Sequence, residues 1–195
     1  TGSATFDCSS TSNHIYTSLS DATFGTTSPF TIDFWIYISS IGSGTYRDIF
    51  LNKTSEQPGR IMLMITSSGY LAYNLYDQSV LTSSSAIGTG AWHHVAMVGE
   101  TTYLKLYIDG TQVFSTLRTA STIGSQDWST FCLGSTFNTN SSCTYYIDEL
   151  RFSNIARWTA AFTPPTSAYS ASIVDNRLSD LKISDINHAM CQGRL

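Results

Sequence analysis

Two adjacent carboxylates, Asp148 and Glu149, are the first residues of this chain to consider for chemistry. A glycosidase uses two carboxyl groups that flank one glycosidic bond. Carboxylates two residues apart on a strand share a face, whereas adjacent residues point to opposite faces. Asp33 is the only acid in its own apolar run. We therefore predict no catalytic pair at Asp148 and Glu149, no catalytic residue elsewhere, and a protein that is not an enzyme.

The neighbouring histidines His93 and His94 have the chemistry of a metal ligand or a general base. On a strand they too would face apart. The sequence offers no cysteine, aspartate or further histidine at ligand spacing beside them, and no Ser-His-Asp arrangement. We predict structural roles for both side chains.

Cys8, Cys132, Cys143 and Cys191 allow three disulfide pairings, and no two of them form a CxxC zinc motif. Cys132 and Cys143 flank a short turn-rich segment, so they would meet if the flanking strands pair. Cys8 and Cys191 would then join the two ends of the chain. The alternative is four buried thiols in a reducing compartment; the extracellular composition of the chain favours the disulfides.

Exposed aromatic side chains are the usual platform for the apolar face of a sugar ring. The chain has 11 tyrosines and 4 tryptophans. Each single residue has a competing role in the core, but together they favour a glycan-binding surface. The candidates on predicted strands or in a polar loop are Trp35, Tyr37, Tyr73, Tyr103, Tyr107 and Trp128.

Asn52 and Asn140 begin N-glycosylation sequons, which matter only if the source glycosylates its proteins.

Charged residues are only 12% of the chain, about half the usual share. The net charge of −4 and the lack of a basic stripe argue against nucleic acid as a partner. No apolar run reaches the length of a membrane span. The first residue is Thr1, which we interpret as a processed or excised start.

The apolar pattern predicts strands almost throughout. In Phe30–Ile38 every second residue is apolar, which is the clearest strand signal in the chain. Asp109-Gly110 predicts a two-residue hairpin, and Ser67–Gly69 a second turn. Loops are predicted at Ser39–Thr45, Thr82–Gly90 and Thr119–Asp127. Further strands are predicted at Arg60–Thr66, Tyr70–Tyr76, Ala91–Val98, Thr102–Ile108, Thr111–Leu117, Thr130–Gly134 and Cys143–Phe152.

This succession of short strands predicts an all-β, two-sheet antiparallel jelly-roll sandwich. Residues 1–170 form the predicted domain. Within it, Ile155–Tyr169 contains Pro164-Pro165 and predicts an irregular strap packed on the sandwich. Residues 171–195 change in character and form a predicted C-terminal tail, either a short helix or an arm that adds to the sheet edge of a neighbouring subunit.

Several phrases resemble the laminin-G-like, concanavalin A-like jelly-roll family over about residues 2–170. They are Ala4–Ser10 (ATFDCSS), Phe30–Tyr37 (FTIDFWIY), Trp92–Ala96 (WHHVA), Leu106–Gly110 (LYIDG), Ile147–Phe152 (IDELRF) and Ala156–Thr166 (ARWTAAFTPPT). The last phrase resembles tailed-phage structural proteins and microbial surface proteins. Related jelly rolls often hold Ca²⁺, so the resemblance implies a possible calcium site at Asp7 and Asp148 if the first and last strands pair.

The fold hosts many functions, so the resemblance specifies the fold better than the activity. The first hypothesis is a non-catalytic structural or adhesion module on a virion, filament or cell surface. It would assemble with copies of itself or a larger particle and contact glycans. The alternative is a free, lectin-like carbohydrate-binding module that depends on calcium. A third, a hydrolase with an unrecognised site, is disfavoured by the missing acid pair.

Overall fold

The computed structural model describes nine segments of the chain: residues 3–7, 14–17, 23–24, 28–52, 60–75, 79–118, 126–127, 131–134 and 143–169. In these segments the secondary structure consists of strands, without a helix. Accordingly, the described part has no long apolar helix of the kind that crosses a membrane. The predicted tail 171–195, and with it Cys191, lies outside these segments, as does Cys8.

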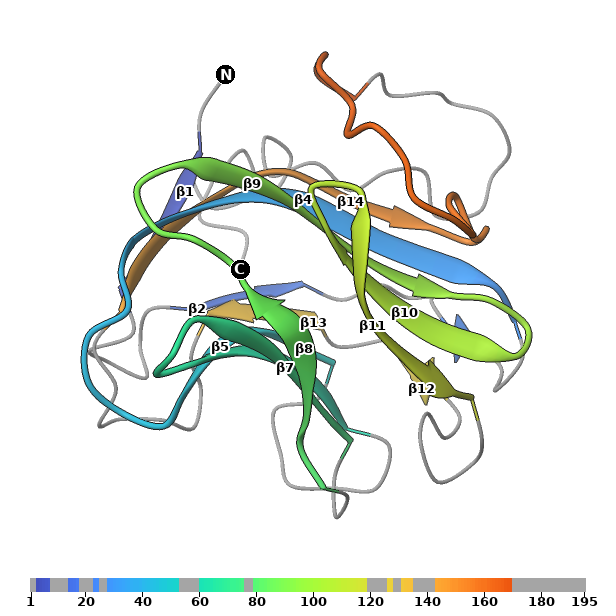
Figure 1. Cartoon of the computed structure of the whole chain (residues 1–195), viewed down its shortest axis with the longest axis horizontal. Coiled ribbons are helices and arrows are strands. Elements are labelled where there is room, and N and C mark those ends of the chain that lie inside the picture. The colour runs from blue at the N-terminus through green and yellow to red at the C-terminus, as the bar shows by residue number, and fades with distance from the viewer. Residues whose placement is uncertain are drawn as a thin grey trace.

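The strands form two six-stranded antiparallel sheets that face each other (Figure 1). The first sheet has the order β1 (Ala4–Asp7), β14 (Thr144–Ser153), β4 (Phe30–Ser40), β9 (Trp92–Gly99), β10 (Tyr103–Ile108) and β11 (Thr111–Leu117). The second has the order β2 (His14–Thr17), β13 (Phe131–Gly134), β5 (Tyr46–Leu51), β6 (Ile61–Thr66), β7 (Tyr70–Leu75) and β8 (Leu81–Ala86). A small ribbon pairs β12 (Gln126–Asp127) with β3 (Thr23–Phe24). The predicted fold class, a two-sheet antiparallel sandwich, is confirmed.

The alternation of β4 places its apolar residues between the sheets. Phe30, Ile32, Phe34, Ile36 and Ile38 are all fully buried in the main core. Opposite them, Ile61, Leu63 and Ile65 of β6 contribute the second wall of that core. The other face of β4 carries Thr31, Asp33, Trp35 and Tyr37, and these residues point away from the second sheet.

The two predicted turns are also confirmed. Asp109 and Gly110 both have positive φ, 49° and 78°, as a tight hairpin of this type requires. At the second turn, the amide of Gly69 donates to the carbonyl of Thr66 at 3.0 Å. The hairpin at Asp109-Gly110 joins β10 to β11 and, as shown below, is where the strap docks.

Two loop predictions are wrong in part. All of β8 but its first residue lies in the segment Thr82–Gly90, and β12 lies in Thr119–Asp127, both of which were predicted as loops. β8 is an edge strand with the polar sequence LTSSSA, and most of its residues are exposed. It is a strand because its main chain pairs with β7, which no apolar alternation reveals. The strand β5 was likewise missed.

The predicted Cys132–Cys143 disulfide is wrong, because both cysteines are buried and unlinked. The prediction required their strands to pair, yet β13 pairs with β2 and β5 while β14 pairs with β1 and β4. Cys132 therefore lies in the second sheet, whereas Cys143 directly precedes β14 of the first. Burial, followed by the negative charge of Asp48, raises the pKa of the Cys132 thiol to about 12.

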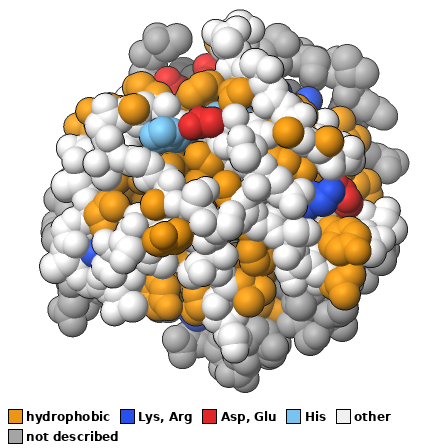
Figure 2. All heavy atoms as spheres, viewed as in Figure 1, with side chains coloured by type: hydrophobic (Ala, Val, Ile, Leu, Met, Phe, Trp, Pro, Cys, Tyr) orange, Lys and Arg blue, Asp and Glu red, His pale blue; other side chains and the backbone are white. Residues whose placement is uncertain are grey.

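The surface matches the low charge of the sequence. Figure 2 shows one face of the molecule, where hydrophobic side chains form separate patches among uncharged polar atoms and few acidic or basic groups are visible. Such a surface offers a neutral ligand more contacts than it offers a charged polymer.

Candidate functional site

A strap of residues 154–169 crosses the outer face of the first sheet, as predicted for Ile155–Tyr169 (Figure 1). Its side chains Trp158 and Phe162 stack on each other with ring centroids 4.0 Å apart. With Ala156 they pack on a small apolar cluster that β9 and β10 present on this face. That cluster consists of Ala96, Val98 and Tyr107.

The hairpin between β10 and β11 holds the middle of the strap. The amide of Phe162 donates to the carbonyl of Gly110 at 3.0 Å. A Cβ atom on Gly110 would lie 1.7 Å from the carbonyl oxygen of Phe162, so only glycine permits this approach. The strap is therefore fixed by main-chain contact as well as by its aromatic rings.

A buried polar network lies beneath the strap and is centred on Asp33. Arg151 donates to both carboxylate oxygens of Asp33, at 3.1 Å and 2.8 Å. The hydroxyl of Tyr169 donates to the same carboxylate at 2.6 Å. The Nε2 atom of His94 lies 3.0 Å from the Tyr169 hydroxyl and 3.4 Å from Asp33. The guanidinium of Arg151 also stacks on the Tyr169 ring at 3.7 Å, so the network ties the end of the strap to the sheet.

The network sets the protonation of Asp33. Burial alone would raise the pKa of Asp33, but the hydrogen bonds from His94, Arg151 and Tyr169 and the charge of Arg151 outweigh it. The pKa of Asp33 is therefore below its ordinary value. Burial and the adjacent Asp33 carboxylate raise the pKa of Tyr169, so its hydroxyl stays a donor. We assign this network to holding the strap.

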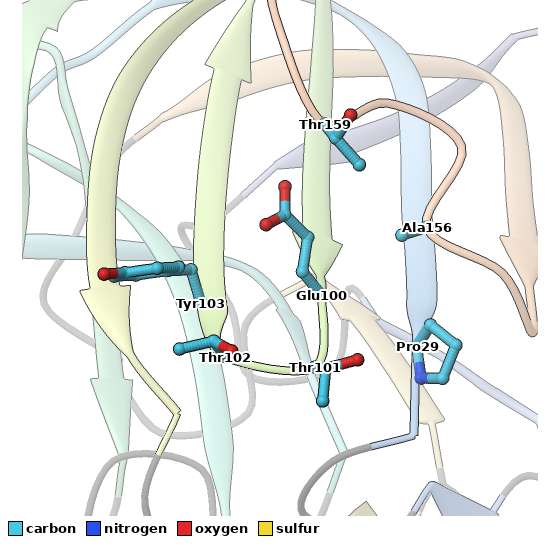
Figure 3. A pocket seen from close by; sticks show the side chains of 7 residues that line it. All are labelled: Pro29, Glu100, Thr101, Thr102, Tyr103, Ala156 and Thr159. Carbon is cyan, nitrogen blue, oxygen red and sulfur yellow. The ribbon is translucent and has the colours of Figure 1, made fainter.

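The same strap forms one wall of a hollow of about 370 Å³ at the β9–β10 turn (Figure 3). In Figure 3 the carboxylate of Glu100 lies in the middle, between Tyr103 on one side and Ala156 and Pro29 on the other. Tyr103 is 42% exposed. The lining residues are Pro29, Glu100, Thr101, Thr102, Tyr103, Ala156 and Thr159.

The charged groups of the hollow are held in place by neighbours. The Nζ atom of Lys105 donates to the carboxylate of Glu100 and, at 2.9 Å, to the carbonyl of Thr159. Arg118 donates to the carbonyl of Glu100 and, at 2.9 Å, to that of Ser28. The hollow thus combines an exposed aromatic ring, threonine hydroxyls and a neutralised carboxylate in a fixed frame.

The structure places the predicted sugar-binding aromatic residues in different environments. Tyr103 lines the hollow, whereas Tyr73 is buried in the main core and Tyr107 is buried beneath Phe162. The expected exposure of Tyr73 and Tyr107 is therefore wrong, because the sandwich interior and the strap cover them. Trp35 packs edge-on against His94 at 5.4 Å. Trp128 lies outside the described segments.

Tyr37 belongs to a row of side chains that crosses four strands of the first sheet. Thr5 of β1 is opposite Tyr146, Tyr146 is opposite Tyr37, and Tyr37 is opposite Trp92. The ring centroid of Tyr37 lies 5.9 Å from that of Tyr146 and 5.8 Å from that of Trp92. Trp92 is 41% exposed.

The prediction that Asp148 and Glu149 face opposite sides of the sheet is wrong. The register shifts between Asp148 and Arg151, and Glu149 has a φ of +52°. This bulge adds a residue, so both acids lie on the outer side while Ile147 and Leu150 fill the core. After the bulge, Arg151 is opposite Asp33 and is buried against it.

Both acids of the bulge bind main-chain amides. The carboxylate of Asp148 accepts from the amide of Glu149 at 2.9 Å, and that of Glu149 accepts from the amide of Tyr169 at 2.7 Å. These bonds give each carboxylate a role in positioning the bulge or the strap.

The two histidines face apart as predicted, since His94 is opposite Trp35 while His93 is opposite the core residue Ile36. The Nδ1 atom of His93 lies 2.7 Å from the carboxylate of Asp109.

The calcium site at Asp7 and Asp148 stays a prediction, and the strand pairing that it required, β1 with β14, is present. Asp7 is opposite Thr144, which is four residues before Asp148 on β14. At about 3.3 Å per residue the backbone positions of Asp7 and Asp148 are about 13 Å apart along the strand, which argues against one shared ion. Within the described segments, no group of three or more His, Cys, Asp and Glu side chains is placed to hold a metal.

The sequon at Asn52 does not present an accessible acceptor. Asn52 is fully buried, and its Oδ1 atom accepts a hydrogen bond from the amide of Ile61 at 2.6 Å. This burial argues against glycosylation of Asn52 in the folded chain, because the side chain joins β5 to β6; the sequon itself stays a prediction. Asn140 lies outside the described segments.

Comparison with known proteins bears on the fold. A family profile described as the concanavalin A-like lectin/glucanases superfamily matches residues 10–160. The chain belongs to this superfamily. Among curated proteins, none matches this chain.

Solved structures share the superfamily fold. The binding domain of Paraclostridial Mosquitocidal Protein 1 has a TM-score of 0.62 and 18% identity, over 79% of this chain and 40% of that one. The ligand binding domain of botulinum neurotoxin serotype D, in complex with N-acetylneuraminic acid, has a TM-score of 0.62 and 21% identity, over 79% and 39%. This chain therefore spans about 40% of the length of these domains, and the likeness shows the fold alone.

Sequence reasoning missed most of the hollow. Glu100 and Thr101 lie between two predicted strands and Thr102 begins the second of them, but nothing in the sequence marked this position as a site. Thr159 gave no signal, because only the docking of the strap brings it to the β9–β10 turn.

Proposed function

We propose that this chain is a non-catalytic carbohydrate-binding module of a secreted or surface-displayed protein, and that the hollow at Tyr103 is its binding site. The observation that carries the proposal is the lining of that hollow. An exposed tyrosine ring can stack on a sugar, and the hydroxyls of Thr101, Thr102 and Thr159 can bond to sugar hydroxyls. Its volume of about 370 Å³ is within the usual range for small-ligand sites.

The charge of the hollow favours a neutral sugar. Its acid, Glu100, is already paired with Lys105, so the two charges offset each other. Among the described lining residues there is no arginine for the bidentate binding of a carboxylate. We therefore infer a neutral saccharide as the ligand, in contrast to the acidic sugar present in the neurotoxin D complex.

The relatives support the general class of function. Both compared structures are described as binding domains, and one is in complex with a sugar. Both belong to toxins, which supports a secreted or surface location for this chain as well.

A glycan array tests the proposal. We expect binding to neutral glycans, and Tyr103→Ala to weaken it at least about tenfold, or about 1.4 kcal/mol, because the stacking ring is removed. Tyr70→Ala is the matched control, since Tyr70 is 37% exposed on β7 of the other sheet. Equal effects of the two substitutions, or binding to acidic glycans only, would contradict the assignment.

The non-catalytic part of the proposal rests on the main-chain bonds of Asp148 and Glu149. Incubation with neutral polysaccharides should release no reducing sugar. Release that Glu149→Gln abolishes would overturn this part.

Assembly with copies of itself, or within a virion or filament, stays a prediction. The low charge of the chain favours close packing of neighbours. The molecular mass in solution tests it directly: a multimer supports an assembly module, and a monomer supports the free lectin-like module.

A further inference from the structure

The row formed by Thr5, Tyr146, Tyr37 and Trp92 has the geometry of a platform. Its members are direct ladder partners, so they form a straight line perpendicular to the strands. Three strand spacings of about 4.8 Å make the row about 14 Å long. The two ring contacts of Tyr37 hold the aromatic residues against one another.

This row differs from the rest of the same face in its contacts with the strap. The strap makes its contacts on the neighbouring rows, at His94, Asp33 and Thr31. Tyr37 and Tyr146 are half-buried, and Trp92 keeps a large exposed surface. A tryptophan at the end of a continuous aromatic row, with this exposure, is typical of a ligand contact.

The chemistry of the row specifies the ligand. Its side chains carry three aromatic rings and three hydroxyls, the latter on Thr5, Tyr37 and Tyr146. None of the four is a carboxylate, a histidine, a lysine or an arginine. The nearest acid on the adjoining row, Asp148, is bonded to the amide of Glu149. Flanking hydroxyls come from Thr144 and Ser40, which are opposite each other on β14 and β4.

We propose that this row is a second binding site, which takes a run of linked neutral sugars from a linear polysaccharide. The rings stack on the apolar faces of successive sugars, and the threonine and serine hydroxyls bond to the sugar hydroxyls. The proposal rests on the carbohydrate-binding function proposed above, but the site is separate from the hollow, to which Trp92 and Tyr37 do not contribute.

Affinity electrophoresis of the full chain through gels containing soluble β-glucan, xylan or galactomannan tests the platform. We expect at least one polymer to retard the protein, and Trp92→Ala to weaken that retardation about tenfold. Trp92→Phe should recover most of the binding, because it keeps a stacking ring. Tyr70→Ala on β7 is the control for loss of an exposed aromatic residue.

The outcomes separate this site from the hollow. Loss of polymer binding in Trp92→Ala, with short oligosaccharides still bound, supports the platform. Equal retardation of Trp92→Ala and Tyr70→Ala, retardation by hyaluronate alone, or no retardation by any polymer overturns it. If Tyr103→Ala abolishes oligosaccharide binding while no polymer binds, the hollow stands and the platform falls.

Discussion

Asp33 is a buried carboxylate whose donors come from three distant parts of the chain: His94 on β9, Arg151 on β14 and Tyr169 at the end of the strap. A buried charge is tolerated only when it is paired and hydrogen-bonded. Here the pairing has a structural result, because it fixes the strap that lines the hollow.

Replacing Asp33 by Asn should destabilise the fold by about 3–5 kcal/mol, because the charge of Arg151 stays buried without its partner. Urea denaturation measures the change. Asp109→Asn is the control: Asp109 is about half exposed, and its loss should change stability by no more than about 1 kcal/mol. A similar effect of the two substitutions would contradict the role of the network.

The same residue predicts a dependence on pH. The pKa of Asp33 is lowered in the folded chain, so its contribution is fully present above the unfolded pKa and is lost as the pH falls through the folded pKa. We expect the free energy of unfolding to fall on acidification below about pH 4, and less steeply in Asp33→Asn. Parallel pH profiles of the two proteins would argue against this assignment.

At the scale of elements, the strap is an irregular segment that packs on the outer face of the first sheet. It has no strand of its own, and it is held by aromatic packing, the Asp33 network and the main-chain contact at Gly110. The hollow is complete only when the strap is docked, because Ala156 and Thr159 belong to it.

Gly110→Ala should displace the strap. The new Cβ would meet the Phe162 carbonyl at 1.7 Å, in addition to the strain of a φ of +78°. Gly90→Ala is the matched control, since its φ is +79° and nothing lies within 4 Å of the added atom. We expect about 1 kcal/mol from Gly90→Ala and clearly more from Gly110→Ala, with faster amide exchange in the strap. Equal losses would mean that the contact is unimportant.

At the scale of the whole molecule, the low charge leaves little electrostatic attraction between the protein and a ligand. The chain has a formal net charge of −4, and only 12% of its residues are charged. Both proposed sites are neutral: one through the Glu100–Lys105 pair, the other through its aromatic composition.

Glycan binding should therefore depend little on salt. Between about 0.05 M and about 0.5 M NaCl we expect the dissociation constant to change by less than about twofold, since screening has little charge to act on. Titration calorimetry at the two salt concentrations measures this. A steep loss of affinity at high salt would indicate an acidic ligand.

Local sequence pattern correctly predicted the features that depend only on residues nearby in the chain. The alternation of Phe30–Ile38 predicted which side of β4 enters the core, and Asp109-Gly110 predicted its hairpin. The strap was predicted from its prolines and its resemblance to family members. Of the hollow, the sequence indicated Tyr103, because its position on a strand was readable.

The amino-acid sequence by itself thus determined the strands with clear apolar alternation, the sandwich and the neutral surface, because these follow from side-chain period and composition. It did not determine β5 or the polar edge strand β8. Tertiary structure decided which strands are neighbours, and with them every contact between distant residues. It placed Cys132 in the second sheet and Cys143 directly before β14 of the first, put the backbone of Asp7 opposite Thr144, and buried Asn52. It also aligned Tyr146, Tyr37 and Trp92, since register between strands depends on the whole ladder and on bulges that no local pattern encodes.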